Sequence, residues 1–424
     1  MPADSCGFLV KNIQSTVSYF RAYVTPILTI VGVFGNSLAL YLFATHQPRN
    51  RFAIYAMALA ISDSLVLLSN SFLDDFVGSG LPFLTNGRLG VKLDALSVEA
   101  CRLMELTGFW FIFTSGSLLV AFSLDRVACL FRPMQCRTNE GIKLALLVCG
   151  VIMALGLLLG LPQVMLFELS DRDPAANTTQ AYPFNESEQH NRRRPVCTLD
   201  GKYLVEFRFI LVVVLTYLLP CVCLLFTNVL IAYQLVKLKR RRHILCNTEQ
   251  KTKQMHLWNA SSIPERQESA YPDSTISTFM ERRRTTALEG RREIGRVVAL
   301  LILSCLHLCF SLPVSVSLAL RASVPNDASK CQRHMYEHLT RLLTSIKDIN
   351  YALNGFIYTF FFRFYRARLV RILSCGQVDI SKRPANRIAT VHGTASVPQT
   401  LNQPDNYRRS IVSSKCLPTS GCSG

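Results

Sequence analysis

Seven long apolar blocks constrain what this chain can fold into more than any other feature. Each has about 20 residues or more, the length that a helix needs to cross the hydrocarbon core of a bilayer. Backbone groups inside lipid must find their hydrogen bonds within the segment, so each block is expected to be a helix. The sequence predicts an all-α membrane protein, a seven-transmembrane helix bundle. The blocks are 22–45, 52–73, 103–124, 144–167, 209–236, 297–320 and 342–362.

The distribution of Lys and Arg predicts how the helices are oriented. Thirteen of these residues lie within 237–292 and ten follow Phe362, whereas five lie within 168–203. Basic segments stay on the cytoplasmic side of a membrane, so we expect a multi-pass plasma-membrane protein with an extracellular N-terminus. The glycosylation motifs at Asn177 and Asn185 then fall in an outer loop. The expected parts are an outer tail (1–21), a helical domain (22–375) with a basic flexible inner loop (237–292), and a cytoplasmic tail (376–424).

The formal net charge of +18 has two readings. A basic chain can bind nucleic acid, but here the basic residues stand beside the ends of the apolar blocks. At such positions they orient helices and contact anionic lipid headgroups. We therefore expect membrane lipid, and no nucleic acid, as a partner.

Cysteines and one carboxylate stand out within this pattern. Of fifteen cysteines, four are expected outside, where disulfides form, and four cysteines allow three connectivities. These are Cys6, Cys101, Cys197 and Cys331. No Cys/His cluster has zinc-finger spacing, so no structural metal site is expected. Asp63 lies in the second block, and a carboxylate at that depth marks a functional site or a polar packing network.

Four short motifs follow one another in order along the chain. They are Gly35-Asn36, Leu59-Ala60-Ile61-Ser62-Asp63, Cys101 with 25 residues to the Arg of Asp125-Arg126, and Asn354-Gly355-Phe356-Ile357-Tyr358. This ordered set resembles the rhodopsin-like (class A) G-protein-coupled receptors, and among them neuropeptide receptors. The resemblance covers about residues 22–375 and implies that a ligand binds outside while a heterotrimeric G protein exchanges nucleotide inside. It implies no enzyme activity.

Carried over residue by residue, the resemblance assigns roles to matching positions. It implies a Cys101–Cys197 disulfide, and Cys6 with Cys331 could form a second. The implied G-protein switch consists of Arg126, its partners Asp125 and Glu293, and Tyr358. A sodium site, with a purely structural polar network as the alternative, maps to Asp63, Ser115, Asn350 and Asn354.

Three departures from the family pattern put the transmission of the signal in doubt. Ser311 replaces the usual sixth-helix tryptophan, Asn228 a fifth-helix tyrosine, and Gly355 the seventh-helix proline. Coupling to the G protein is therefore expected to differ, and a non-signalling decoy is an alternative.

The ligand is predicted from charges expected at the outer end. Gly108 stands where monoamine receptors carry an aspartate, and Asp348 where opsins carry a lysine. The remaining candidates indicate a short peptide, basic or amidated, with Glu105 and Asp348 as its acidic contacts. Alternatives are a lipid or other small-molecule ligand, Lys347 paired with a carboxylate such as Glu105 or extending outward, and a transporter or channel. The candidate set is Glu105, Gly108, Phe109, Arg341, Lys347 and Asp348.

The chain after the seventh block contains signals for membrane attachment and regulation. Apolar residues at helical spacing between Phe362 and Ile372 alternate with arginines and predict a short amphipathic eighth helix. Cys375 follows it and is a candidate for palmitoylation, with an ordinary reduced thiol as the alternative. Serines near Arg408-Arg409 are candidate sites for a receptor kinase, and their phosphates would bind an arrestin.

Overall fold

The structure is a computed structural model. It describes residues 3–45, 50–131, 140–171, 195–199, 202–237, 240, 273–324, 329–361, 365–367 and 369–370. Residues 1–375 form one compact unit. The segment 376–424, expected as a cytoplasmic tail, lies outside the described residues.

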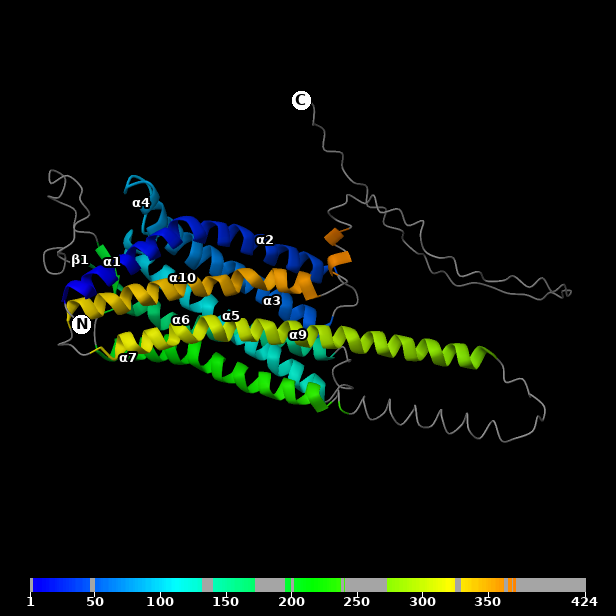
Figure 1. Cartoon of the computed structure of the whole chain (residues 1–424). Coiled ribbons are helices and arrows are strands. Elements are labelled where there is room, and N and C mark those ends of the chain that lie inside the picture. The colour runs from blue at the N-terminus through cyan, green and yellow to red at the C-terminus, as the bar shows by residue number, and fades with distance from the viewer. Residues whose placement is uncertain are drawn as a thin grey trace, which may run out of the picture. The chain divides into compact units, whose positions relative to one another are not determined.

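Seven helical rods make up the described part of this unit (Figure 1). Three rods contain π-helical segments, whose i→i+5 hydrogen bonds widen the turn. The rods are α1–η1–α2 (Ala3–Tyr19, Phe20–Val24, Thr25–Ala44), α3–η2–α4 (Arg51–Val66, Leu67–Gly80, Leu81–Leu84), α5 (Val98–Phe131), α6 (Glu140–Leu166), α7–η6 (Lys202–Phe209, Ile210–Leu218) with the helical residues 219–237, α9 (Asp273–Ala322) and α10 (Lys330–Phe361).

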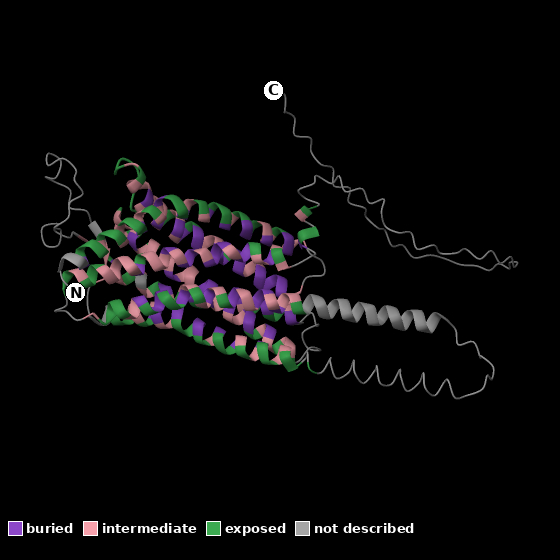
Figure 2. Ribbon diagram, viewed as in Figure 1, coloured by how far each residue is buried: buried purple, intermediate pink, exposed green. Residues whose placement is uncertain are grey.

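Among the described helices, six of these rods are long and apolar enough to cross a membrane. The rod that does not meet this criterion is α10. The sides of the helices that face away from the bundle interior carry exposed apolar side chains such as Ile30 and Phe226, as expected of helices that face lipid. The seventh rod, α10, packs between α9 and α2. Six of its polar residues, Lys347 and Asn354 among them, are buried, so much of the polarity in its membrane-spanning part points into the bundle (Figure 2).

The N-terminal segment differs from the expected tail. Residues Ala3–Tyr19 form α1, which continues into the first rod and packs against α10. A disulfide between Cys6 and Cys331, with Cα atoms 6.3 Å apart, holds the start of α1 to the start of α10. The cross-link and the burial of Val17 explain why a segment of modest hydrophobicity is ordered. We call the end of the bundle that carries this disulfide the outer end.

A two-stranded hairpin covers part of the outer end. Strands β1 (Glu168–Asp171) and β2 (Pro195–Thr198) are antiparallel, with Leu169 opposite Cys197. Cys197 forms a disulfide with Cys101 near the start of α5, and their Cα atoms are 5.6 Å apart. Both disulfide pairings expected from the sequence are therefore formed. They hold the hairpin and α1 to the helical bundle.

Several helix boundaries lie beyond those expected. The second rod continues to Leu84, so Asp74 and Asp75 belong to η2 and not to an outer loop. Helix α9 begins at Asp273, inside the segment expected as a flexible loop, and α6 continues through Pro162 to Leu166. Of the expected eighth helix, residues 365–367 and 369–370 are described as helical.

Gly355 has a structural role where the family pattern has proline. A Cβ atom there would collide with the backbone of Gly35 and Asn36. The missing side chain therefore allows α10 to approach α2 closely, and Asn36 donates a hydrogen bond to the Tyr351 carbonyl (3.1 Å). Small residues have this function in many membrane helix pairs.

Gly355→Ala is expected to lower the free energy of unfolding by about 1–3 kcal/mol, because a methyl group would push two backbones apart. The measurement is thermal unfolding of the detergent-solubilised protein. Gly150→Ala is the matched control, since a Cβ atom there meets nothing within 4 Å. Equal thermal midpoints for the two variants would contradict this account of the α2–α10 contact.

Candidate functional site

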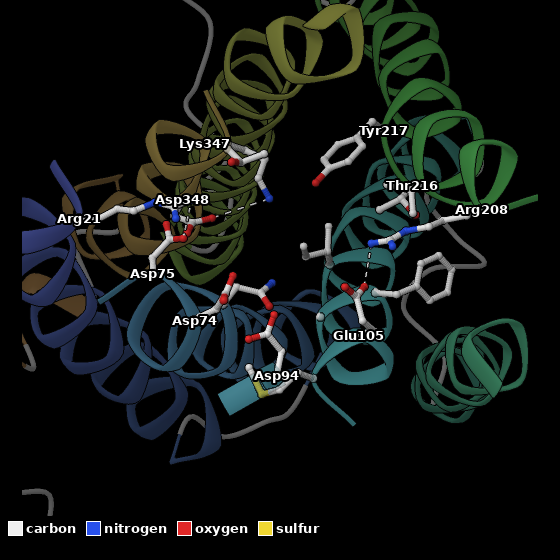
Figure 3. Close-up of a pocket in the computed structure, with 17 residues that line it drawn as sticks. Arg21, Asp74, Asp75, Asp94, Glu105, Arg208, Thr216, Tyr217, Lys347 and Asp348 are labelled. Atoms are coloured by element: carbon white, nitrogen blue, oxygen red, sulfur yellow. Dashed lines mark hydrogen bonds and ion pairs between the residues drawn. The ribbon is translucent and has the colours of Figure 1, made fainter. Parts of the chain in front are cut away.

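A cavity of about 300 Å³ opens at the outer end of the bundle (Figure 3). Ligand pockets in proteins start at about this volume. Seven of its lining residues lie in the π-helical segments η1, η2 and η6. Five of the six residues predicted from the sequence line it, and they are Glu105, Gly108, Phe109, Lys347 and Asp348.

Arg341, the sixth predicted residue, is not among the residues that line this cavity. Its guanidinium is paired with Glu337 one helical turn earlier, at 2.6 Å, and the Arg341 side chain is about half exposed. The sequence assigns Arg341 to the correct helix, α10, but cannot fix the direction in which its side chain points.

Glu105 has a partner that sequence reasoning missed. Arg208 of α7 binds its carboxylate at 2.8 Å, and the guanidinium lies over the ring of Phe167, 4.6 Å from the centroid. The suggested Lys347–Glu105 pair is therefore wrong. Arg208 directly precedes the fifth apolar block, and such a cation reads in the sequence as an ordinary membrane-end residue.

Lys347 is buried on the cavity wall and does not extend outward. Its ammonium group lies 3.1 Å from the Tyr351 hydroxyl and 3.7 Å from the Asp348 carboxylate. It also stands over the rings of Tyr217 and Tyr351, at 5.3 and 4.8 Å from the centroids. Asp348 accepts a hydrogen bond from Ser71 at 2.6 Å. Aromatic faces and a carboxylate together replace the water that this cation loses.

A second ion pair joins the first, second and seventh rods beside this group (Figure 3). Arg21 of η1 binds Asp75 of η2 at 2.9 Å. Ser345 of α10 donates to the same carboxylate at 2.7 Å and accepts from Arg21 at 3.1 Å. The sequence places Arg21 in a tail and Asp75 in a loop, so it could not pair them.

Asp63 sits at the centre of the bundle, where its side chain is fully buried. It accepts hydrogen bonds from Ser115 of α5 at 2.5 Å and from Asn354 of α10. Asn350, the fourth residue of the implied sodium site, makes its contact elsewhere, with the His307 ring at 3.4 Å. Three of the four candidates converge. The Asp63 carboxylate and the Ser115 hydroxyl present oxygen atoms, which suit a hard cation, whereas Asn354 turns its amide nitrogen toward Asp63.

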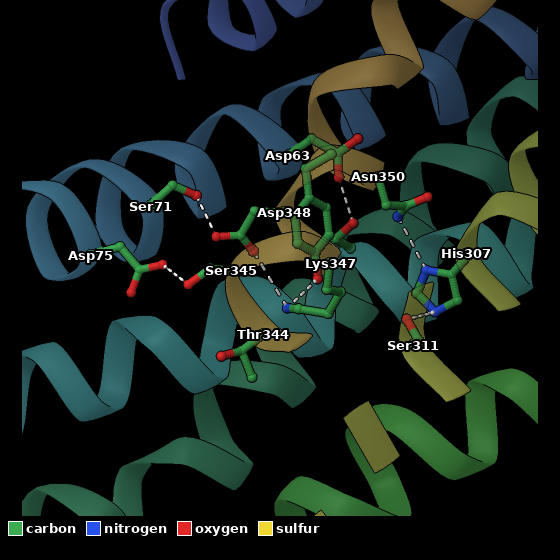
Figure 4. A network of polar contacts seen from close by, with 12 residues as sticks. Asp63, Ser71, Asp75, His307, Ser311, Thr344, Ser345, Lys347, Asp348 and Asn350 are labelled. Carbon is green, nitrogen blue, oxygen red and sulfur yellow. Dashed lines mark hydrogen bonds and ion pairs between the residues drawn. The ribbon is translucent and has the colours of Figure 1, made fainter. Parts of the chain in front are cut away.

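His307 is a packed polar residue in the middle of the bundle, as the sequence suggested, but its partners could not be predicted. It is buried in α9, and its second ring nitrogen lies 3.4 Å from the Ser311 hydroxyl. Ser311, His307 and Asn350 thus form a polar chain from α9 to α10 (Figure 4). This chain occupies the level of the bundle where the family pattern has a tryptophan.

The inner end of α5 carries the implied switch arginine. Arg126 is buried and binds Asp125 at 2.6 Å, and its guanidinium is 5.7 Å from the centroid of the Phe52 ring. Asp125 also binds Arg51, at the start of α3, at 3.2 Å. Arg51 was not expected as a partner.

Other predicted switch, modification and lipidation sites fall into two groups. Tyr358 is buried, with its ring edge-on to Phe43 at a centroid distance of 5.2 Å. The side chain of Glu293, and the whole of Asn177, Asn185 and Cys375, lie outside the described residues.

Comparison with known proteins identifies the family. The profile of the 7 transmembrane receptor (rhodopsin family) matches residues 35–358, so the chain belongs to that family. The C5a anaphylatoxin chemotactic receptor 1 of Rattus norvegicus is 28% identical over 178 residues, 42% of this chain and 46% of the relative. The C3a anaphylatoxin chemotactic receptor of Oncorhynchus mykiss is 28% identical over 149 residues, 35% and 37% of the two chains.

A third relative is the Probable G-protein coupled receptor 34 of Mus musculus, 24% identical over 239 residues, which are 56% of each chain. The matched parts thus span between about a third and just over half of these relatives. The family and these relatives are receptors and not enzymes. Membership implies an extracellular ligand and a G protein.

Removing the Lys347 charge alone is expected to destabilise the protein strongly. Lys347→Met would leave the Asp348 carboxylate buried without its cation, which costs about 3–5 kcal/mol of unfolding free energy. The double variant Lys347→Met/Asp348→Asn should regain most of the loss because no unpaired charge remains. Thermal unfolding of both variants tests this, and a double variant no better than the single one would rule out charge burial as the cause.

Proposed function

We propose that the chain is a plasma-membrane receptor for a short peptide and passes ligand binding to nucleotide exchange on a heterotrimeric G protein. The observation that carries this proposal is that α5 lines the outer cavity with Glu105 and holds Arg126 at its inner end. One rigid helix thus spans the distance between a ligand site and the G-protein side. The N-terminus is proposed to lie outside.

Several features support a polar, charged ligand. Eight of the seventeen residues that line the cavity carry an ionisable acid or base, and such groups bind ligands through charge-assisted hydrogen bonds. The predicted ligand contacts are Glu105, Lys347 and Asp348. Each already has a partner of opposite charge, so these residues would meet the ligand as ion pairs. Phe109 would supply an apolar surface, and Gly108 would leave room beside it.

Two other functions are kept as candidates for specific reasons. A lipid or other small molecule would also fit a cavity of about 300 Å³. A decoy that binds without signalling is suggested by Ser311, Asn228 and Gly355, which depart from the family pattern at switch positions.

The proposal also includes partners and modifications. The partners are an arrestin and a receptor kinase, and the modifications are glycosylation at Asn177 and Asn185 and palmitoylation at Cys375.

Reconstituted receptor should catalyse guanine-nucleotide exchange on a heterotrimeric G protein when a stimulating peptide is present. The experiment screens libraries of short peptides against receptor in lipid nanodiscs. Arg126→Ala should abolish at least about nine-tenths of the stimulated exchange, since Arg126 is proposed to contact the G protein. Arg88→Ala, at an exposed arginine far along the chain from the switch, is the matched control.

The outcomes separate the candidates. Exchange that survives Arg126→Ala would refute the assigned switch. Stimulation by lipids but by none of the peptides would replace the peptide with a lipid. Peptide binding without exchange would make the chain a decoy.

We also propose that Asp63, Ser115 and Asn354 hold Na⁺, with Asn350 nearby, and that the ion stabilises one helix arrangement. Replacing choline chloride by NaCl at constant ionic strength should then raise the thermal unfolding midpoint of the wild-type receptor. Ligand binding of this kind stabilises the folded state by mass action. The rise should disappear in Asp63→Asn. A sodium effect of equal size in this variant, or none in the wild type, would leave the group as a polar packing network.

A further inference from the structure

The charges around the outer cavity are unevenly paired. Each of its three basic side chains is bound to one carboxylate. Five carboxylates line the cavity, so five minus three leaves two without a cation from the cavity wall. The pairs are Arg21–Asp75, Arg208–Glu105 and Lys347–Asp348, and the two remaining acids are Asp74 and Asp94.

These two acids lack sufficient partners within the described part of the chain. Asp74 makes no hydrogen bond or ion pair to any described residue. Asp94 has one oxygen bound to Lys92 at 2.9 Å, but that lysine side chain is 51% exposed, and exposed ion pairs contribute little. The other Asp94 oxygen is buried and has no hydrogen-bond partner among the described residues. Asp74 and Asp94 lie side by side on one wall (Figure 3). They come from two contacting segments, η2 and the short 3-10 helix η3 (Leu93–Ala95).

A hydrogen-bond donor stands one helical turn away from Asp74. The side-chain nitrogen of Asn70 is buried and has no acceptor among the described residues. Gly108 of α5 faces the Asn70 side chain. A Cβ atom at Gly108 would lie only 3.1 Å from the Asn70 side-chain oxygen. A buried amide donor without an acceptor costs about 1–3 kcal/mol. A ligand that supplies a carbonyl oxygen to this donor therefore gains binding free energy.

The three groups together define the chemistry of what binds. Two carboxylates accept from an ammonium group, which has three donors, and the Asn70 amide donates to a carbonyl. In a peptide with a free N-terminus these two groups are neighbours, because a single α-carbon joins the ammonium nitrogen to the first carbonyl carbon. A C-terminal carboxylate would instead be repelled by Asp74 and Asp94. Phe109 and Tyr217 also line the cavity and offer aromatic surface to the first side chain.

We propose that Asp74, Asp94 and Asn70 form a subsite for the free α-ammonium group of a peptide ligand and the carbonyl that follows it. The inference rests on the proposed peptide-receptor function and names the end of the peptide that enters the cavity. A volume of about 300 Å³ accommodates one or two residues. Peptides with a blocked N-terminus are therefore excluded, whereas the chemical form of the C-terminus does not matter to this subsite.

The test uses a small probe, so it does not depend on knowing the natural peptide. L-Phenylalaninamide contains the ammonium, the carbonyl and an aromatic side chain. In N-acetyl-L-phenylalaninamide an uncharged amide replaces the ammonium group. For a ligand of this size a Kd on the order of 1 mM is expected. The Kd is measured from the rise of the thermal unfolding midpoint of the purified, full-length receptor with probe concentration.

The free amine should bind at least about tenfold more tightly than its acetylated form. Asp74→Asn should weaken binding of the free amine by at least about tenfold, the effect expected for loss of a charge-assisted hydrogen bond. Asp74→Glu should retain most of the affinity, because it keeps the charge. Glu99→Gln removes the same charge at an exposed position that does not line the cavity and should leave the Kd unchanged.

Equal binding of the two probes, no binding of either, or equal Kd values for wild type and Asp74→Asn would overturn the proposal. If the unliganded Asp74→Asn receptor unfolds early, Asp94→Asn serves as the second test, with the same expected loss. Failure of the proposed function appears in a different assay. In that case the probe still binds in the predicted order, while no peptide stimulates nucleotide exchange.

Discussion

The cost of placing charge inside a membrane protein determines how the rods of this bundle are arranged. Apolar side chains give adjacent helices little preference for one rotation over another, because lipid is as apolar as they are. Buried charges do give such a preference, since an unpaired one costs several kcal/mol. Asp63 is bound from both α5 and α10, and Asp348 of α10 is bound from η2. Each contact thereby fixes the rotation of one rod against another.

These polar contacts follow the interior from the outer cavity to the inner end. Arg21 and Asp75 stand at the outer end, Lys347 and Asp348 next to the cavity, and Asp63 at the centre. Ligand charges would therefore enter a site whose own charges already hold the helices together. A ligand that repartners one of these groups would change a helix contact, and this links binding to rearrangement without an aromatic switch residue.

Hydropathy predicted the number of rods, and cysteine position predicted which four cysteines lie in an oxidising compartment. The Cys101–Cys197 pairing came from the family resemblance, with Cys6–Cys331 as a possible second bond, and both are formed. The sequence could not predict the pairings of charges. Arg208 and Arg51 stand at the edges of apolar blocks, where cations usually mark the membrane surface, yet both turn toward carboxylates of α5. The π-helical turns of η2 and η6 shift the directions in which side chains point, and no periodicity in the sequence predicts these turns. Asp74 read as a loop residue because the apolar block ends at Leu73. The rod in fact continues to Leu84 and places Asp74 on the cavity wall.

The disulfide between Cys6 and Cys331 also limits the route by which a ligand can arrive. It joins the outer starts of α1 and α10, so the first and last rods are held together covalently across a separation of 325 residues. At the outer end the two rods cannot part to form a side entrance from the bilayer without breaking this bond. The bond therefore opposes a lateral opening toward lipid at this one seam, while the other disulfide holds the hairpin to α5 at the same end.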